Sequence, residues 1–252
     1  MRYFVFVLLS SIILAGCAAT FPPDHVKDFR LQIMGKETVQ ISAGGMERQV
    51  ELTIEEESRT QHLYGYIPIG PTPETKVFVN DKQISAVKST MTDIMSTTFI
   101  AKFKRDINAS NVYKIRIEGK GESLTFEYRS LYFKVTAPDR FAKGRDKQFD
   151  VQLEKNEADS TNIDFIHNKA PNGKEDLCTF TFAPKTDAIP PVPKSLSFSP
   201  KEIERSELYP PGSRCKITLS VLARAENGSI KTRYNPVKTR SFFRYEKDLV
   251  ID

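Results

Sequence analysis

Asp164 and His167 are the residues of this sequence that most resemble a catalytic or metal-binding pair. A carboxylate and an imidazole can transfer protons or bind a metal. The residues around them alternate as a strand does, and strand side chains three positions apart point to opposite faces. The other histidines, His25 and His62, belong to no metal-ligand spacing. We therefore expect no metal site and no cofactor, and a solvated surface at Asp164.

No sequence pattern of a nucleophilic or phosphate-binding enzyme is present either. The chain has no Gly-x-Ser-x-Gly elbow, and Gly119-Lys-Gly121 has the form of a hairpin turn, not of a phosphate loop between strand and helix. A pair of carboxylates can meet from any two places in a sequence, so a glycosidase site would leave no pattern. The sequence favours a non-enzymatic protein, with a hydrolase as the third alternative.

Basic residues gather near the carboxyl end of the chain. Between Arg214 and Lys247 there are nine basic and two acidic residues. Strand alternation predicts that Lys231 and Arg233 share one face, and that another face carries Lys238, Arg240 and Arg244.

This ribbon, flanked by Phe242, is a candidate contact for an anionic partner: lipid headgroups, an envelope polysaccharide or an acidic protein edge. The alternative is a solvated edge strand whose charges prevent aggregation. The formal net charge of +5 is too small a bias to indicate nucleic acid as a partner.

Residues 1 to 16 have the layout of a cleavable export signal. Arg2 precedes an apolar stretch from Tyr3 to Leu14, and small residues follow up to Cys17. A transmembrane helix is the alternative, but it needs about 20 apolar residues, more than this stretch has.

The tetrapeptide Leu14-Ala15-Gly16-Cys17 resembles the lipobox of bacterial lipoproteins. The resemblance implies cleavage before Cys17 and acylation of its thiol and its new amino group. Several acyl chains attach a protein stably to a membrane without spanning it. In that family the next residue sorts the protein, and Ala18 implies the outer membrane, with the periplasmic or surface face left open.

Two further cysteines, Cys178 and Cys215, fall at inward positions of strand-like segments. An even pair in an exported chain indicates a disulfide bond. Two separate buried thiols are the alternative, because free cysteine is commonly buried.

Period-two alternation of apolar and polar residues predicts an all-β fold. Residues 112–117 and 124–128 alternate on either side of Gly119-Lys-Gly121, and hairpins are predicted across Asn80-Asp81 and Asn227-Gly228. Residues 85–95 are the best helical candidate. Many short strands with frequent turn signals are typical of β-sandwiches and barrels.

A domain boundary is predicted near Ser130, where one strand pattern ends and another begins without a linker. The expected units are a signal peptide (1–16), a lipid-anchored tether (17–28), an amino-terminal sandwich (29–130) and an immunoglobulin-like sandwich (131–252). Residues 208–223 resemble the corner before the sixth strand of fibronectin type III domains. They depart from it at one position, because Cys215 occupies the place where the family usually has a tyrosine. The resemblance implies an immunoglobulin-like fold, and the expected architecture is two such domains in tandem. It implies no function, because this fold has many unrelated functions.

Together these features predict a non-enzymatic envelope lipoprotein that binds or assembles a partner protein at the outer membrane. The alternative is a binding module for a glycan or an anionic envelope polymer.

Overall fold

The structure is a computed structural model, and it describes residues 30–42, 44–56, 75–88, 97–119, 121–142, 145–167, 180–185, 192–202 and 215–251. These residues form three β-sheets, so the prediction of an all-β, sandwich-like fold is confirmed. Cys17 and the rest of the predicted export signal and tether lie outside the described residues.

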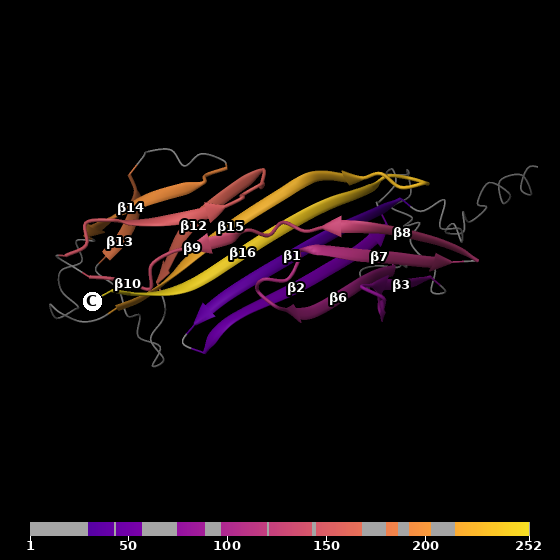
Figure 1. Cartoon of the computed structure of the whole chain (residues 1–252), viewed down its shortest axis with the longest axis horizontal. Helices are drawn as coiled ribbons and strands as arrows, with labels where there is room; N and C mark the ends of the chain where they lie inside the picture. Colours follow the sequence, from indigo (N-terminus) through magenta and orange to yellow (C-terminus); the bar gives the residue numbers. More distant parts are fainter. Residues whose placement is uncertain are drawn as a thin grey trace, which may run out of the picture.

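The largest sheet has eight strands and contains both ends of the described chain. Its order is β12 (Ser160–His167), β15 (Cys215–Ile230), β16 (Val237–Ile251), β1 (Leu31–Ser42), β2 (Gly45–Glu56), β6 (Thr97–Arg105) and β5 (Ala86–Lys88), with the short β10 (Arg140–Phe141) beside the end of β16. Figure 1 shows β15 and β16 running obliquely along much of the molecule, beside β1 and β2.

Two four-stranded sheets complete the fold. One has the order β13 (Phe180–Pro184), β14 (Ser195–Glu202), β11 (Phe149–Glu154) and β9 (Lys134–Thr136). The other has the order β4 (Lys82–Ile84), β3 (Lys76–Val79), β7 (Val112–Gly119) and β8 (Glu122–Arg129). They lie toward opposite ends of the molecule (Figure 1).

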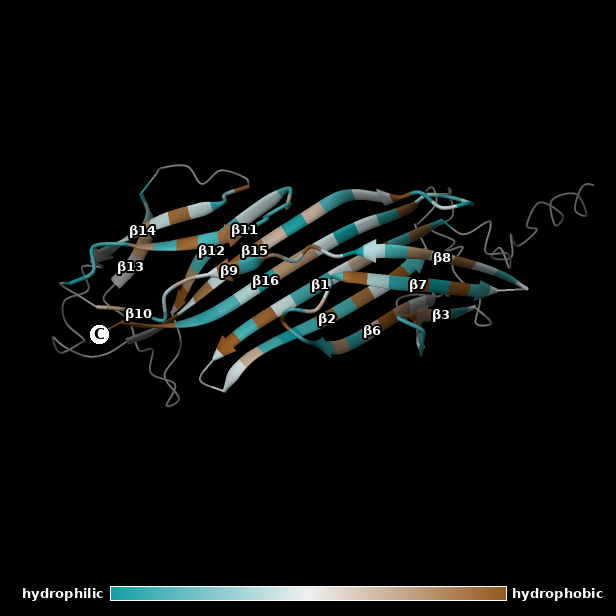
Figure 2. Cartoon of the chain, in the orientation of Figure 1, coloured by the Kyte–Doolittle hydropathy of each residue, from teal (hydrophilic) through white to brown (hydrophobic). Residues whose placement is uncertain are grey.

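Alternation along the long strands gives the large sheet one apolar and one polar face. β16 alternates strictly from Ser241 to Ile251, with the odd positions buried, and Figure 2 shows the corresponding change of hydropathy along the strands. Such a pattern places apolar residues against a packed layer and polar residues in solvent. We call the two faces of this sheet the inner and the outer face.

The inner face supports two hydrophobic clusters. The first contains most of the buried residues after Leu131, together with Val39 of β1. The second contains most of the buried apolar residues of β1 to β8, together with Val237 of β16. Each cluster therefore includes a side chain from the other side of the predicted boundary at Ser130.

β1 and β16 lie side by side and are parallel, from the pair Gln32 and Lys238 to the pair Ile41 and Lys247. Strands of the predicted units 29–130 and 131–252 thus belong to one sheet. The division into two tandem immunoglobulin-like domains stays a prediction.

The hairpins predicted at Asn80-Asp81 and at Gly119-Lys-Gly121 are confirmed. Asn80 and Asp81 have φ of 50° and 64°, and Gly121 has φ of 77°, as tight turns between antiparallel strands require. The helix predicted over residues 85–95 is wrong where the structure describes it, because residues 86–88 form β5 against β6.

The hairpin predicted across Asn227-Gly228 is also wrong. β15 continues through these residues to Ile230, and the register against β16 shifts between Ala225 and Gly228. The residues between these two positions, Glu226 and Asn227, form a β-bulge, which inserts extra chain without reversing its direction. A Cβ atom on Gly228 would lie 2.1 Å from Thr239 Oγ1, so glycine is needed there for close approach.

Candidate functional site

The predicted basic ribbon divides into two parts in the structure. Lys238, Arg240 and Arg244 lie on the outer face of β16, each between neighbours that are more buried or point to the inner face. Lys231 and Arg233 do not share a strand face as predicted, because β15 ends at Ile230 and both residues lie in the loop 231–236.

Arg233 connects this loop to β8. Its guanidinium donates to the carbonyl oxygen of Ser123 and lies 4.7 Å from the ring centroid of Tyr234. The candidate contact surface is therefore centred on β16, away from this loop.

Phe242 is a half-exposed aromatic residue with a basic residue on each of its four sides. Its pairing partners are Arg224 on β15 and Lys36 on β1. Arg240 and Arg244 precede and follow it on the same face of β16. The environment combines an apolar ring with several cations, which favours ligands that carry both negative charge and an apolar face.

Two lysines on β6 extend this patch across the sheet. Lys102 pairs with Glu51 of β2, which in turn pairs with Lys36. Lys104 lies one row further along, beside Gln49. We call the resulting surface the basic band; its residues are Lys36, Lys102, Lys104, Arg224, Arg240, Phe242 and Arg244.

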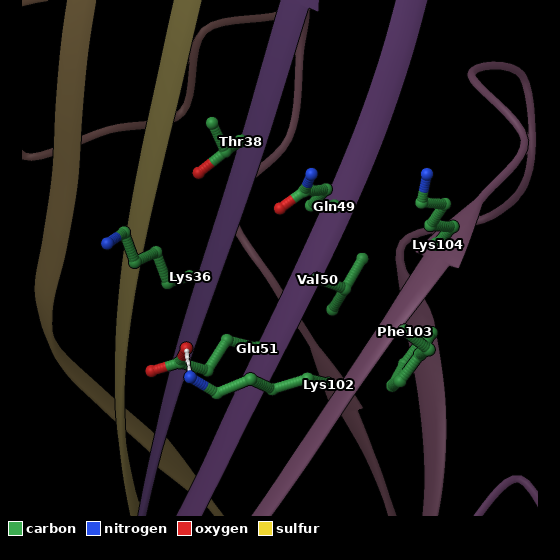
Figure 3. A pocket seen from close by; sticks show the side chains of 8 residues that line it. All are labelled: Lys36, Thr38, Gln49, Val50, Glu51, Lys102, Phe103 and Lys104. Atoms are coloured by element: carbon green, nitrogen blue, oxygen red, sulfur yellow. Dashed lines mark ion pairs between the residues drawn. The ribbon is translucent and has the colours of Figure 1, made fainter.

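The band includes a shallow hollow of about 330 Å³ over β1, β2 and β6. Figure 3 shows its side chains: Lys36 projects from β1, and Glu51 of β2 meets Lys102 of β6 in an ion pair. Lys104 stands at the other end of the hollow. Three ammonium groups and one carboxylate thus line it, which gives it a net positive charge.

Most of the cations have acidic partners, but these pairs are on the surface. Lys102 lies 2.8 Å from Glu51 and is 69% exposed, and Arg224 lies 3.5 Å from Glu226 and is 61% exposed. Exposed ion pairs contribute only about 0 to 1 kcal/mol, so a ligand can replace the partner at little cost.

The hydrogen bond from Lys104 lowers the pKa of Glu47 below its ordinary value. Arg244 lies 2.5 Å from Glu246. Within the described part of the chain, neither Lys36 nor Arg240 forms an ion pair.

A second group of charged residues lies on the inner face, between the two hydrophobic clusters. We call it the buried polar cluster; its members are Glu37, Arg48, Tyr113 and Ser130. Arg48 Nε donates to Glu37 Oε2 over 2.6 Å, while Tyr113 donates to Glu37 Oε1 over 2.8 Å and Ser130 donates to the same oxygen. Burial, and then the charge of Glu37, raises the pKa of the Tyr113 phenol.

The buried polar cluster has no access for a substrate, since the Glu37 and Arg48 side chains are 0% exposed. The Glu37 carboxylate accepts hydrogen bonds from three buried donors. This arrangement is typical of a structural role and not of proton transfer to a ligand. Alternation gave a signal for it, because Glu37 falls on the same face of β1 as Leu31 and Ile33. We did not predict it from the sequence.

The structure describes only part of the set Asp164, His167, His25 and His62, for which the sequence predicts no metal site. Asp164 is exposed on β12 and accepts a hydrogen bond from Asn162 over 2.8 Å. In the described ranges, no three His, Cys, Asp or Glu side chains gather as metal ligands would. His25 and His62 lie outside these ranges, and for His167 only the backbone, at the end of β12, is described.

The predicted disulfide cannot be followed, because Cys178 lies outside the described residues and only the backbone of Cys215 is described, at the start of β15. No helix in the described ranges is long and apolar enough to cross a membrane.

No protein family matches this sequence, and no curated protein matches it. The function must therefore be inferred from the surfaces of this chain.

Proposed function

We propose that this protein is a non-enzymatic cell-envelope lipoprotein that acts as a protein-interaction or structural assembly module at the outer membrane. The observation that carries the proposal is the outer face of the eight-stranded sheet, where the exposed basic band lies opposite an apolar inner face. A broad charged face on a stiff sheet suits recognition of a complementary surface.

Exposed apolar residues on the outer face, one beside the band and one beyond the row of Asp164, support a protein partner. Leu222 of β15 is 40% exposed and pairs with Arg244, while Ile166 of the edge strand β12 is 43% exposed. Apolar contacts next to charged ones are typical of protein interfaces. β12 also lies at the edge of the large sheet, where a partner strand could pair with it.

The membrane anchor rests on the lipobox resemblance at Cys17. About a dozen residues separate Cys17 from the first strand, and at about 3.3 Å per extended residue they reach about 40 Å. A lipid on Cys17 would keep the start of β1 within that distance of the membrane surface, among other envelope proteins.

Two measurements on the full-length protein in its host test this proposal. Palmitate labelling should mark the wild type and not Cys17→Ser, and the variant should leave the membrane fraction. Purification in mild detergent with crosslinking should recover a partner protein with the wild type. An unlabelled wild type would overturn the anchor, and a lone monomer after crosslinking would overturn the assembly function.

A second function is favoured by the position of Phe242. A ring among cations suits a glycan or another anionic envelope polymer, since rings pack on sugar faces and cations bind phosphate or carboxylate. Such a module should retain an anionic polymer at low salt and release it as salt rises.

A further inference from the structure

We propose that the basic band is a binding site for a single linear anionic polymer, which lies across the strands with acidic groups on Lys36 and Arg240 and a ring on Phe242. This inference rests on the second function proposed above, and names its site, the direction of the ligand and the residues that select it.

The spacing of the cations sets the direction. Lys102, Lys36 and Arg224 occupy one row that runs perpendicular to the strands, through the pairs Lys102–Glu51, Glu51–Lys36, Lys36–Phe242 and Phe242–Arg224. Neighbouring strands lie about 4.8 Å apart, so these three cations follow each other at about 10 Å. A polymer lying across the strands would meet them in turn.

The width of the band selects a narrow ligand. The next row on one side is acidic, with Glu47, Glu246 and Asp164 in register through Gln40 and Ser220. On strands this row lies about 7 Å beyond Arg244 and Lys104, because two residues span that length. A membrane surface or a protein face that is acidic throughout would cover both rows and meet repulsion from the acidic row, whereas a single polymer chain fits the basic rows alone.

Lys36 and Arg240 are the cations with most to gain from such a ligand. Neither forms an ion pair within the described residues, and both are exposed. The other basic residues must first exchange an acidic partner. Replacing Lys36 and Arg240 should therefore weaken polymer binding more than replacing cations elsewhere.

The experiment compares two charge reversals in the full protein, purified in detergent. Lys36→Glu with Arg240→Glu alters the band. Lys82→Glu with Arg129→Glu is the matched control, because both residues are exposed, lie on the β4-β3-β7-β8 sheet and form no ion pair in the described ranges. Equilibrium binding to polyphosphate and to polygalacturonate is measured at low and at high salt.

The band variant should bind at least about tenfold more weakly than wild type at low salt, while the control changes by about twofold or less. If the wild type binds neither polymer, the second function itself fails. If the wild type binds but the two variants bind equally, polymer binding stands and this site is wrong. Binding to vesicles that contain phosphatidylglycerol, with no binding to either polymer, would also overturn the inference.

The variant Phe242→Ala distinguishes an acidic sugar polymer from polyphosphate as the ligand. A sugar polymer can pack on the ring, whereas polyphosphate has no apolar face. The variant should bind polygalacturonate about fivefold more weakly and polyphosphate as wild type does. Unchanged binding to both polymers would remove the ring contact from the proposal.

Discussion

Arg48 and Glu37 form an ion pair inside the protein, with 2.6 Å between Arg48 Nε and Glu37 Oε2 and neither side chain exposed. Arg48 Nη1 also donates to the carbonyl oxygen of Ala109 over 2.6 Å, and the guanidinium lies 3.7 Å from the ring centroid of Tyr132. Charge is costly to bury unless it is paired and hydrogen-bonded, and here the carboxylate has three donors. The pair therefore fixes how β1, β2 and the segment around Ser130 fit together.

We expect Glu37→Leu to lower the free energy of unfolding by about 3 to 5 kcal/mol, because it leaves the Arg48 charge buried without a partner. Adding Arg48→Met should recover part of this loss, since neither charge then remains. Urea unfolding measures both. The exposed pair Lys102→Met with Glu51→Gln is the control and should leave the urea midpoint unchanged. An unchanged midpoint for Glu37→Leu would show that the ion pair does not hold these strands.

Gly35→Ala should destabilise the protein by about 1 to 3 kcal/mol through overpacking. A Cβ atom there would lie 2.2 Å from Tyr128 Oη, and that hydroxyl is fixed by Ser241 Oγ at 2.6 Å. Adding Tyr128→Phe should recover part of the loss, which a double-mutant cycle in urea would detect. Gly44→Ala is the control, since its nearest new contact is Ser42 Oγ at 3.7 Å. Equal losses for Gly35→Ala with and without Tyr128→Phe would contradict the contact.

Stability should fall as the pH rises from 10 to 12. Burial raises the pKa of Tyr128 from 10 to about 12, and burial also raises the pKa values of Tyr113 and Tyr245. Between these values the unfolded phenol loses its proton and the folded one keeps it. Each such tyrosine then lowers the free energy of unfolding by about 1.4 kcal/mol per pH unit.

Urea unfolding at a series of alkaline pH values checks this dependence, and Tyr128→Phe should make it shallower. Phenolate absorbance of the folded protein gives an independent reading. If the absorbance of all tyrosines rose together near pH 10, the buried phenols would not be perturbed.

A fragment of residues 17–130 should not unfold cooperatively by itself. It lacks β16, which pairs with β1 from Gln32 to Ile41, and it lacks the backbone carbonyl of Arg240 and the hydroxyl of Ser241 that Tyr128 contacts. Adding a polypeptide of residues 215–252 should restore a cooperative urea transition followed by circular dichroism. A fragment that unfolds alone with the midpoint of the intact chain would instead support 29–130 as an independent domain.

Local sequence patterns predicted the strands and the short hairpins well. Alternation at residues 112–117 and 124–128 corresponds to β7 and β8, and Asn80-Asp81 forms the turn between β3 and β4. The same local signal failed at Asn227-Gly228, because these residues suit a bulge as well as a turn. Pairing with β16 decides whether a bulge or a turn is formed. That pairing cannot be predicted from a stretch of five or six residues.

The site was predicted only in part, for a similar reason. Alternation placed Lys238, Arg240 and Arg244 on one face, and in β16 the three residues do share a face. Lys36 and Lys102 reach the same surface from β1 and β6, through strand pairs whose partners are far apart in the sequence. No local pattern gives the register of such pairs, so these members of the basic band required the structure.

The pairing of β1 with β16 also constrains when the protein can fold. Gln40 and Glu246 are hydrogen-bonded neighbours although 206 positions separate them along the chain. Closing so long a loop costs entropy before any contact is gained, so sheets of this kind form slowly. During synthesis β1 can pair with β2 early, but its other edge must wait for nearly the whole polypeptide before β16 exists. Through that interval its unsatisfied backbone is open to chaperones or to aggregation.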